Sequence, residues 1–267
     1  MLPVLCSITD ALESVGIPIE QFHCEGSENA YELVTGPLPP VEAVDSLTTS
    51  KETARRVCRH QNIDLTFNPS PPAINGLHVN ISITGPESDT LEDYFLAGIL
   101  AHIKALCGFA LVRPESYDRT VAGQWCAGRY VAWGTENREM VVRKKRSCLW
   151  ELRLPDAAAQ MYLFVAGVLI SGAAGIQNKT KLTLLDCPAD DRKQYGIEDE
   201  LPSSPSDAFR ALLNDRLMVE HFGEDLLTTY VAVQEAFNNK LDNVGPKENY
   251  QPNHLTDLGH RLSRLQL

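Results

Sequence analysis

Residues 148–179, CLWELRLPDAAAQMYLFVAGVLISGAAGIQNK, predict a strand followed by a long buried helix. The segment CLWELRLPD is read as the strand, and Asp156 is expected to cap the helix that follows it. The apolar run at 161–176 is short for a membrane span, contains several Gly and Ala residues, and lies close to Asp156 and Lys179. We therefore expect a helix inside a protein core, and no membrane partner.

Segments on both sides of this stretch predict a mixed α+β fold with a largely antiparallel sheet, because strands and helices do not alternate regularly. The apolar residues of 77–84 fall at every second position, which is typical of a half-buried strand. Further strands are expected at 19–35, as a strand or hairpin, and at RYVAWGT (129–135) and EMVVRKK (139–145), which we assign to one sheet.

The clearest amphipathic helix spans residues 90–107, with Phe95, Ile99, Ile103 and Leu106 on one face. We expect Asp89 or Thr90 to cap its start and Gly108 to end it. Other helices are expected at 5–15, stopped by Gly16 and Pro18, and at 41–61, 206–220 and 223–243. The predicted division is one catalytic domain at 1–242 and a loosely packed tail at 243–267.

Composition restricts the class of protein. The chain of 267 residues is 43% hydrophobic and 22% charged, which is ordinary for a globular protein with a sizeable core. A net charge of −11 argues against a nucleic-acid partner. Seven scattered cysteines without a CxxC pair fit a reducing compartment, and the first residues lack the basic region of a signal peptide. We therefore expect a cytoplasmic protein.

The stretch FHCEGSENAYE (22–32) concentrates carboxylates, with Glu25 and Glu32 seven residues apart and His23 and Glu28 nearby. It contains no Lys or Arg that would pair with these acids. Two interpretations are open: a site for a hard cation, which prefers carboxylate oxygens, or a solvated acidic hairpin.

Five segments in collinear order resemble glutamine synthetase, over about residues 5–240. They are the acidic stretch at 22–32, GLHVNIS (76–82), FLAGILAHIKAL (95–106), RPESYDRTVAG with YVAWGTENREMVVR (113–143), and the strand and helix at 149–179. The segment WGTENRE is similar to the corresponding sequence in the fungal glutamine-synthetase-like branch. The resemblance implies the catalytic domain of that family, an open or partial antiparallel barrel with helices outside.

The resemblance also implies two Mg²⁺ or Mn²⁺ sites. Glu25 and Glu32 match the ligands of one ion, and His78 and Glu151 match those of the other, so we expect these four side chains to converge within roughly 4–8 Å. Without the resemblance, His78 is a polar strand residue that faces away from the apolar side, and Glu151 is a surface carboxylate on a strand.

Four arginines match family positions that bind substrate carboxylate or the transferring phosphoryl group of ATP. The resemblance assigns Arg119, Arg138 and Arg153 to catalysis, and Ser82 and Arg143 to cofactor binding. The alternative is that these arginines are ion-pair partners of the carboxylates.

The sequence departs from the family pattern at three places. Trp125 stands where the family has the acid that accepts a proton from ammonium, and the N-G-S-G loop is altered to Ala73-Ile74-Asn75-Gly76. We expect Trp125 either to border a cavity with Arg119, Arg138 and Arg153, where it would stack on an aromatic or apolar substrate, or to fill a hole. The β-grasp domain and the E-x-E strand of complete family members do not occur in these 267 residues, and we expect a truncated domain.

Three functions remain open from the sequence. The first is a metal-dependent ligase that activates a γ-carboxylate as an acyl phosphate with ATP and joins it to an amine other than ammonia. The second is an ATP-independent enzyme of specialised metabolism that keeps the metal or arginine pocket, and the third is a non-catalytic binding or regulatory protein. A small-molecule carboxylate or amine is the expected partner, and a homo-oligomer is expected because family active sites form between subunits.

Overall fold

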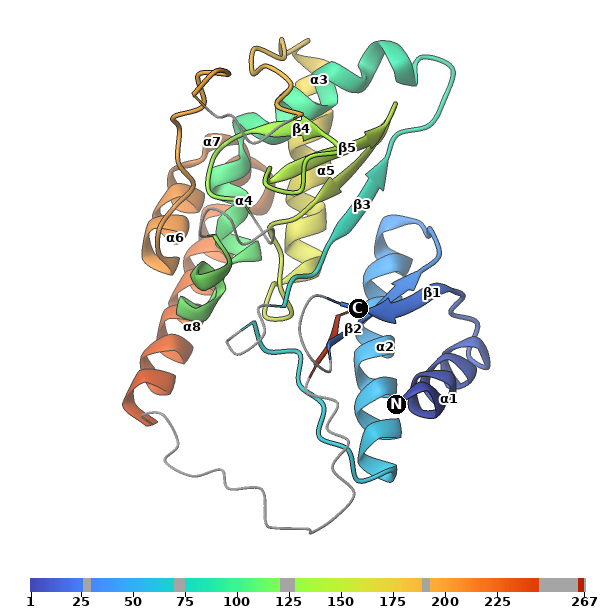
Figure 1. Ribbon diagram of the computed structural model, residues 1–267. Coiled ribbons are helices and arrows are strands. Elements are labelled where there is room, and N and C mark those ends of the chain that lie inside the picture. The colour runs from blue at the N-terminus through green and yellow to red at the C-terminus, as the bar shows by residue number, and fades with distance from the viewer. Residues whose placement is uncertain (26–29, 70–74, 121–127, 189–192, 245–263, 267) are drawn as a thin grey trace. The chain divides into compact units, whose positions relative to one another are not determined.

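The structure is a computed structural model that describes residues 1–25, 30–69, 75–120, 128–188, 193–244 and 264–266 (Figure 1). The chain forms two compact units. The first comprises Met1–Asn75 with Val244–Leu267, and the second comprises Gly76–Asn243. The division predicted from the sequence, into a catalytic domain at 1–242 and a tail at 243–267, stays a prediction. We describe each unit by itself.

The first unit combines two helices with a three-stranded sheet. Helix α1 (Leu2–Glu13) buries Val4, Leu5, Ile8 and Leu12, which occupy positions i, i+1, i+4 and i+8 and so share one face. Gly16 has φ +83°, a conformation that favours glycine, and it follows the end of α1 as the sequence predicts. Helix α2 (Pro40–His60) matches the expected helix at 41–61.

The sheet of the first unit contains the expected hairpin. Strand β1 (Ile19–Cys24) pairs antiparallel with β2 (Ala30–Thr35), and β2 pairs in parallel with the short β7 (Arg264–Gln266). The last described residues of the polar C-terminal segment therefore supply a strand, which its composition does not predict.

The second unit is built on a four-stranded sheet in the order β3-β6-β5-β4. Its strands are β3 (Val79–Ser82), β4 (Trp133–Thr135), β5 (Val142–Arg146) and β6 (Leu149–Leu152). The central β6 is antiparallel to both β3 and β5, whereas β4 and β5 are parallel. The described strands form no closed barrel, and the predicted α+β class with a largely antiparallel sheet is confirmed.

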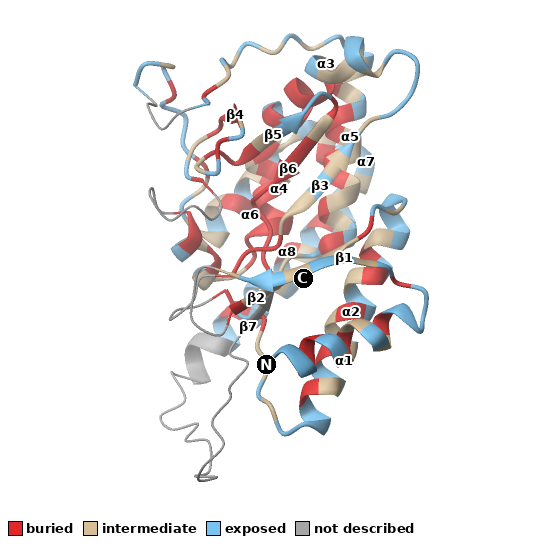
Figure 2. Cartoon of the chain, turned by 45° about the vertical axis from the view of Figure 1, so that its right-hand side comes forward, coloured by how far each residue is buried: buried red, intermediate tan, exposed pale blue. Residues whose placement is uncertain are grey.

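The helices of the second unit carry much of its buried surface (Figure 2). They are α3 (Ser88–Ala101), α4 (Ile103–Ala110), α5 (Met161–Gln177), α6 (Pro205–Asn214), α7 (Arg216–Phe222) and α8 (Glu224–Val244), with a 3₁₀ turn at Pro114–Arg119. Trp150 of β6 is fully buried and its ring centroid lies 5.4 Å from that of Phe95 on α3. The aromatic contact joins the sheet to the helical layer.

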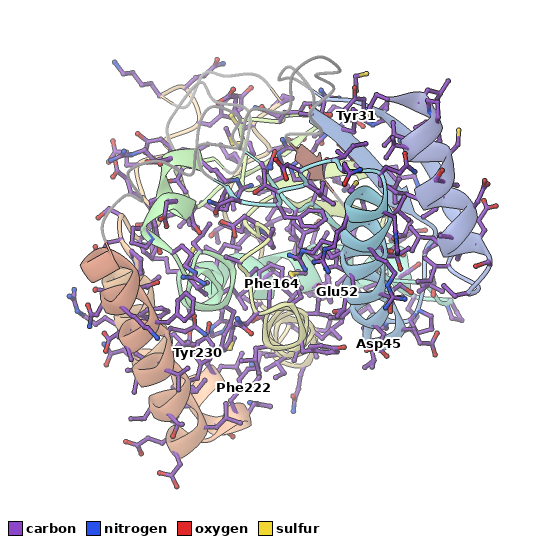
Figure 3. All side chains as sticks on the ribbon, turned by 90° about the horizontal axis from the view of Figure 1, so that it is seen from below. Tyr31, Asp45, Glu52, Phe164, Phe222 and Tyr230 are labelled. Carbon is purple, nitrogen blue, oxygen red and sulfur yellow. The ribbon has the colours of Figure 1, made fainter. Side chains whose placement is uncertain are left out.

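The C-terminal helices pack on α4 through aromatic side chains. The ring of Phe109 lies 5.3 Å from that of Phe222 and 5.4 Å from that of Tyr230, and Figure 3 shows the last two on neighbouring helices. The hydroxyl of Tyr230 donates to the carbonyl of Gly108 at 2.8 Å. Phe164 of α5 is fully buried as well.

Three local predictions from the sequence are wrong. The helix expected at 90–107 is two helices, α3 and α4, bent by 65° around His102. The N-cap of α3 is Glu87, without a side-chain hydrogen bond, in place of Asp89 or Thr90. Gly108 lies inside α4, where a Cβ atom would approach the Leu212 side chain to 3.0 Å. Gly108 therefore allows α6 to pack closely and does not end the helix.

Two further boundaries differ from the sequence prediction. Helix α5 begins at Met161 with Gln160 as its N-cap, and Asp156 accepts a hydrogen bond from the Ala158 N–H at 2.8 Å in the preceding turn. The helix expected at 206–220 is divided at Asp215, whose side chain caps α7. Tertiary partners explain both differences, because Asp156 faces Arg119 and Asp215 faces His102.

The apolar helices also bear on membrane association. Among the described residues no single helix combines the length and the apolar character that crossing a bilayer requires, although the bent pair α3–α4 meets that test by length and composition. Helix α5 is shorter, and it buries Phe164, Val168 and Ser171 among other residues.

Helices α3 and α5 cross at glycines. A Cβ atom on Gly98 would lie 2.2 Å from the Ser171 carbonyl oxygen and 2.8 Å from the Cα atom of Gly175. Both are backbone atoms of α5, so the helices would have to separate. We expect Gly98→Ala to lower the free energy of unfolding by about 1–3 kcal/mol, despite the higher helix propensity of alanine.

Urea unfolding measures this difference. Gly108→Ala is the milder comparison, because its methyl group would meet mainly the side chain of Leu212. A Gly98→Ala variant at least as stable as the wild type would contradict the close crossing.

The hydrogen bond between His102 and Asp215 joins the bend of α3–α4 to the start of α7. Asp215 Oδ2 lies 2.7 Å from His102 Nδ1, and Oδ1 accepts from the Met218 N–H at 3.1 Å. Burial acts to raise the pKa of Asp215, but the hydrogen bonds from His102 and Met218 outweigh burial and hold the pKa below its usual range.

We expect Asp215→Ala to lower the free energy of unfolding by about 1–2 kcal/mol at pH 7, since a helix cap and a charged hydrogen bond are lost. A depressed folded-state pKa stabilises the protein above the unfolded-state value, about 3.9, and this contribution is lost as the pH falls through the folded-state value. The difference between wild type and variant, measured by urea unfolding, should therefore shrink below about pH 4.

Asp199→Ala serves as the control, because Asp199 forms an ion pair with Lys104 on the surface and its side chain is 62% exposed. We expect the control to change stability by less than about 1 kcal/mol. A difference for Asp215→Ala that grows in acid would contradict the assigned direction of the pKa shift.

Candidate functional site

Glu151 lies at the centre of the sheet of the second unit, on β6 between β3 and β5. The strand register places it opposite Asn80 on one side and Arg143 on the other. Its Oε1 atom accepts a hydrogen bond from Arg153 Nη1 and lies 2.9 Å from His78 Nδ1. Its Oε2 atom accepts from Arg143 Nη1 at 2.8 Å. The sheet thus gathers two guanidinium groups and one imidazole around a single carboxylate.

The environment of this carboxylate fixes the charge states of the cluster. Burial acts to raise the pKa of Glu151, but the hydrogen bond with His78 and the charge of Arg153 outweigh burial and hold the pKa well below its ordinary range. Burial lowers the pKa of His78, and the nearby Arg153 and Arg119 act in the same direction. At neutral pH Glu151 is therefore ionised and His78 is neutral, so that His78 donates through Nδ1–H to the carboxylate.

Arg119 is fully buried and donates hydrogen bonds to the backbone that follows β6. Its Nη1 donates to the Leu154 carbonyl at 2.9 Å, its Nη2 donates to the Arg153 carbonyl at 3.2 Å, and Nη1 lies 3.8 Å from Asp156 Oδ2. Gly76 makes room for this arrangement, because a Cβ atom there would lie 2.6 Å from Arg119 Nη2. These contacts give Arg119 a structural role, and its predicted part in catalysis stays a prediction.

The other predicted catalytic and cofactor residues differ in accessibility. Arg153 is 3% exposed, and Arg143 is partly buried and also donates to Glu136 through Nε at 3.1 Å. Arg138 and Ser82 are exposed, and are accessible to a ligand in solution. Trp125 lies outside the described residues, as do Glu28 and 73–74 of the altered loop. The predicted roles of these residues remain predictions.

The hairpin β1–β2 carries a second cluster of polar side chains, in the first unit. His23, Glu25 and Glu32 each place one potential ligand atom within 4.8 Å of the other two. The sequence prediction named the two glutamates as ligands and did not include His23 among the candidates. The spacing was the available signal, because His23 and Glu25 are two residues apart and side chains two apart in an extended chain lie on the same side.

The four predicted metal ligands are divided between the units. Glu25 and Glu32 belong to the first unit, and His78 and Glu151 to the second. Their predicted convergence within roughly 4–8 Å stays a prediction.

The two pairs differ in how well they suit a divalent ion. The donor set of the hairpin consists of two partly exposed carboxylates and an imidazole, all of which are ligands for divalent metals. At Glu151 each carboxylate oxygen already accepts a hydrogen bond from an arginine. The residues of the hairpin therefore fit a metal ion, whereas Glu151 has to share its oxygens with Arg143 and Arg153.

Comparisons with known proteins agree with this architecture. Residues 1–246 match the family model described as "Glutamine synthetase, catalytic domain". The chain is 35% identical to protein fluG of Emericella nidulans over 92% of its length. It is 26% identical to type-1 glutamine synthetase 1 of Dictyostelium discoideum over 89% of its length, and 27% identical to glutamine synthetase of Staphylococcus aureus over 82%.

A solved structure described as "GmaS/ADP complex-Conformation 1" has the same fold. Its TM-score is 0.79 at 23% identity, and the match covers 92% of this chain and 62% of that one. The chain spans about half the length of the two glutamine synthetases, 52% and 54%, and 29% of protein fluG. The resemblance in the sequence and the predicted fold are both confirmed, and the chain belongs to the glutamine synthetase catalytic-domain family.

Proposed function

We propose that the chain is the catalytic domain of a glutamine-synthetase-like ligase that uses ATP and Mg²⁺ or Mn²⁺ to join a γ-carboxylate to an amine other than ammonia. The cluster around Glu151 carries the proposal. In a domain of this family it gathers Arg143 of β5, Arg153 directly after β6 and His78 directly before β3. Guanidinium groups suit carboxylates and transferring phosphoryl groups because they offer planar, paired donors.

The proposed reaction has two steps. A γ-carboxylate oxygen takes the terminal phosphoryl group of ATP, which releases ADP. The amine nitrogen then attacks the acyl carbon, phosphate leaves, and the nitrogen loses a proton to give the amide. A bound divalent ion would supply charge neutralisation for the phosphates.

The residues of the chain have distinct parts in this proposal. Glu151 is fixed by Arg153 and Arg143, and in turn it fixes the ring of His78 through Nδ1. Arg138 is exposed on the segment between β4 and β5, where it is accessible to the carboxylate substrate or to the transferring phosphoryl group. Arg119 holds the chain after β6 and so supports Arg153, whose carbonyl it binds.

Phosphate release tests the proposal. The full chain is incubated with glutamate, ATP, Mg²⁺ or Mn²⁺, and a series of amines that runs from ammonia through alkylamines to aromatic amines. We expect at least one larger amine to stimulate phosphate release more than ammonia does. An absence of ATP-dependent phosphate release with every amine would overturn the ligase assignment and favour an ATP-independent enzyme or a binding protein.

Arg138→Ala is the informative variant for this assay, because an exposed side chain contributes little to folding. We expect the rate to fall by about 10²-fold at an unchanged melting temperature, which is typical of removing one donor to developing charge. Arg146→Ala, an exposed arginine at the end of β5, is the matched control and should leave the rate unchanged. If Arg138→Ala and Arg146→Ala released phosphate at the same rate, Arg138 would have no part in the mechanism.

Three further expectations accompany the proposal. We propose a cytoplasmic location, from the scattered cysteines. We propose a homo-oligomer, because the resemblance to the family implies active sites between subunits. A role in specialised metabolism is proposed from the similarity to a fungal protein, fluG.

A further inference from the structure

Two carboxylates bind the guanidinium group of Arg143 from different sides. Its Nη1 atom donates to Glu151 Oε2 at 2.8 Å, within the cluster described above. Its Nε and Nη2 atoms, which form one edge of the group, both donate to Glu136 Oε2, and the bond from Nε is 3.1 Å long. Arginine binds carboxylate and phosphoryl groups with such an edge of paired donors. Glu136 therefore occupies the part of Arg143 that suits an anionic ligand.

The two carboxylates differ in how firmly they are held. The Glu151 side chain is 7% exposed and also accepts a hydrogen bond from Arg153. The Glu136 side chain is 54% exposed, and Arg143 is its ion-pair partner. An exposed ion pair contributes little net free energy, because water competes for both charges. Glu136 is therefore the partner that a ligand displaces easily, while Glu151 continues to hold Arg143 in position.

The backbone holds Glu136 in place beside Arg143. Glu136 directly follows β4, and its N–H donates to the Lys144 carbonyl at 3.0 Å. The preceding residue, Thr135, donates to Asp186 through its N–H at 2.7 Å and through its hydroxyl at 2.6 Å. Glu136 has φ +55°, a left-handed conformation that is uncommon for residues other than glycine and that recurs at functional sites. The position of this carboxylate is thus built into the fold.

We propose that Glu136 is an internal competitor for anions at Arg143, and that the phosphoryl groups of a polyphosphate ligand displace it when they bind. Glu136 opposes binding in two ways, because it fills the donor edge and repels a second negative charge. A simple monocarboxylate gains nothing by replacing one carboxylate with another, whereas a polyphosphate makes further contacts and so gains from the exchange. The inference rests on the proposed function only in that Arg143 binds the phosphoryl groups of ATP.

Isothermal titration calorimetry of the full chain tests the competition without catalysis. The probes are β,γ-imido-ATP with Mg²⁺, which cannot transfer its terminal phosphoryl group, and pyrophosphate with Mg²⁺. Glu136→Gln keeps the size of the side chain and removes its charge. We expect this variant to lower the Kd of both probes by about two- to fivefold, which is the range that an exposed ion pair contributes. The ligand-free melting temperature should stay close to that of the wild type, since Glu136 is 54% exposed.

Glu200→Gln is the matched control. Glu200 is a 46% exposed carboxylate that accepts a hydrogen bond from Arg129 at 2.7 Å, so this variant makes the same change in net charge at another exposed ion pair. It should leave the Kd of both probes unchanged.

Two further measurements distinguish competition from a merely structural effect of Glu136. The gain in affinity from Glu136→Gln should shrink as the salt concentration rises, because salt screens exposed charges. In an Arg143→Ala background the same substitution should give no gain, because the competitor acts through Arg143.

The outcomes separate the inference from the proposed function. An affinity that Glu136→Gln leaves unchanged or weakens, an equal gain in Glu200→Gln, or the failure of both probes to bind would overturn the role of Glu136. Tighter pyrophosphate binding in Glu136→Gln, in a chain that releases no phosphate with any amine, would uphold this inference and overturn the ligase proposal. Phosphate release together with unchanged affinities in Glu136→Gln would do the reverse.

Discussion

Glutamate, ATP and ammonia are expected to give no appreciable glutamine with this chain. The reason is Trp125, which the resemblance aligns with the acid that accepts a proton from ammonium in the glutamine synthetase family. An indole cannot accept that proton, and positioned proton transfer typically contributes about 10²–10⁴-fold to a rate. A coupled assay for glutamine, with phosphate release in parallel, measures the effect.

Trp125→Glu provides the converse experiment. Restoring a carboxylate should raise the ammonia-dependent rate, by up to about 10²–10⁴-fold if proton transfer is the only missing function. Trp125→Gln has a similar side-chain size to the glutamate variant but cannot accept a proton, and it should remain inactive with ammonia. Glutamine formation by the wild type at the rate of a complete family enzyme would show that Trp125 does not exclude ammonia.

Glu151→Ala is expected to destabilise the second unit by about 3–5 kcal/mol, which is the usual cost of removing one member of a buried ion pair. Glu151 is 5% exposed, and its loss leaves Arg143, Arg153 and His78 close together without their shared carboxylate. For a chain of this size we expect the melting temperature to fall by roughly 6–20 °C. Thermal and urea unfolding measure the change.

Two variants separate charge from shape at this position. Glu151→Gln keeps the size of the side chain but removes its charge, so the remaining loss is electrostatic. Glu136 is the outer partner of Arg143, and the Glu136 side chain is 54% exposed. Glu136→Ala should therefore cost less than about 1 kcal/mol. A stability of Glu151→Ala within 1 kcal/mol of the wild type would contradict the central place of Glu151 in the cluster.

Local patterns predicted most of the elements. The alternation at 77–84 anticipated β3, the apolar run at 161–176 anticipated α5, and a strand or hairpin was expected at 19–35. Apolar residues continue on both sides of His102, so periodicity predicted one helix. At the bend, His102 lies 2.7 Å from Asp215, a residue 113 positions away whose contact no local pattern reveals.

The sequence by itself determined the family, the order of its motifs, and the chemical types available for a site: carboxylates at 25, 32 and 151, histidine at 78, and a series of arginines. The tertiary structure decided which of these groups meet. The register of β1 with β2 brought His23 opposite Glu32, and β6 placed Glu151 between His78 and two arginines. The physical reason is that periodicity depends on neighbours along the chain, whereas charge pairing and burial depend on strands and helices that pack together from distant positions.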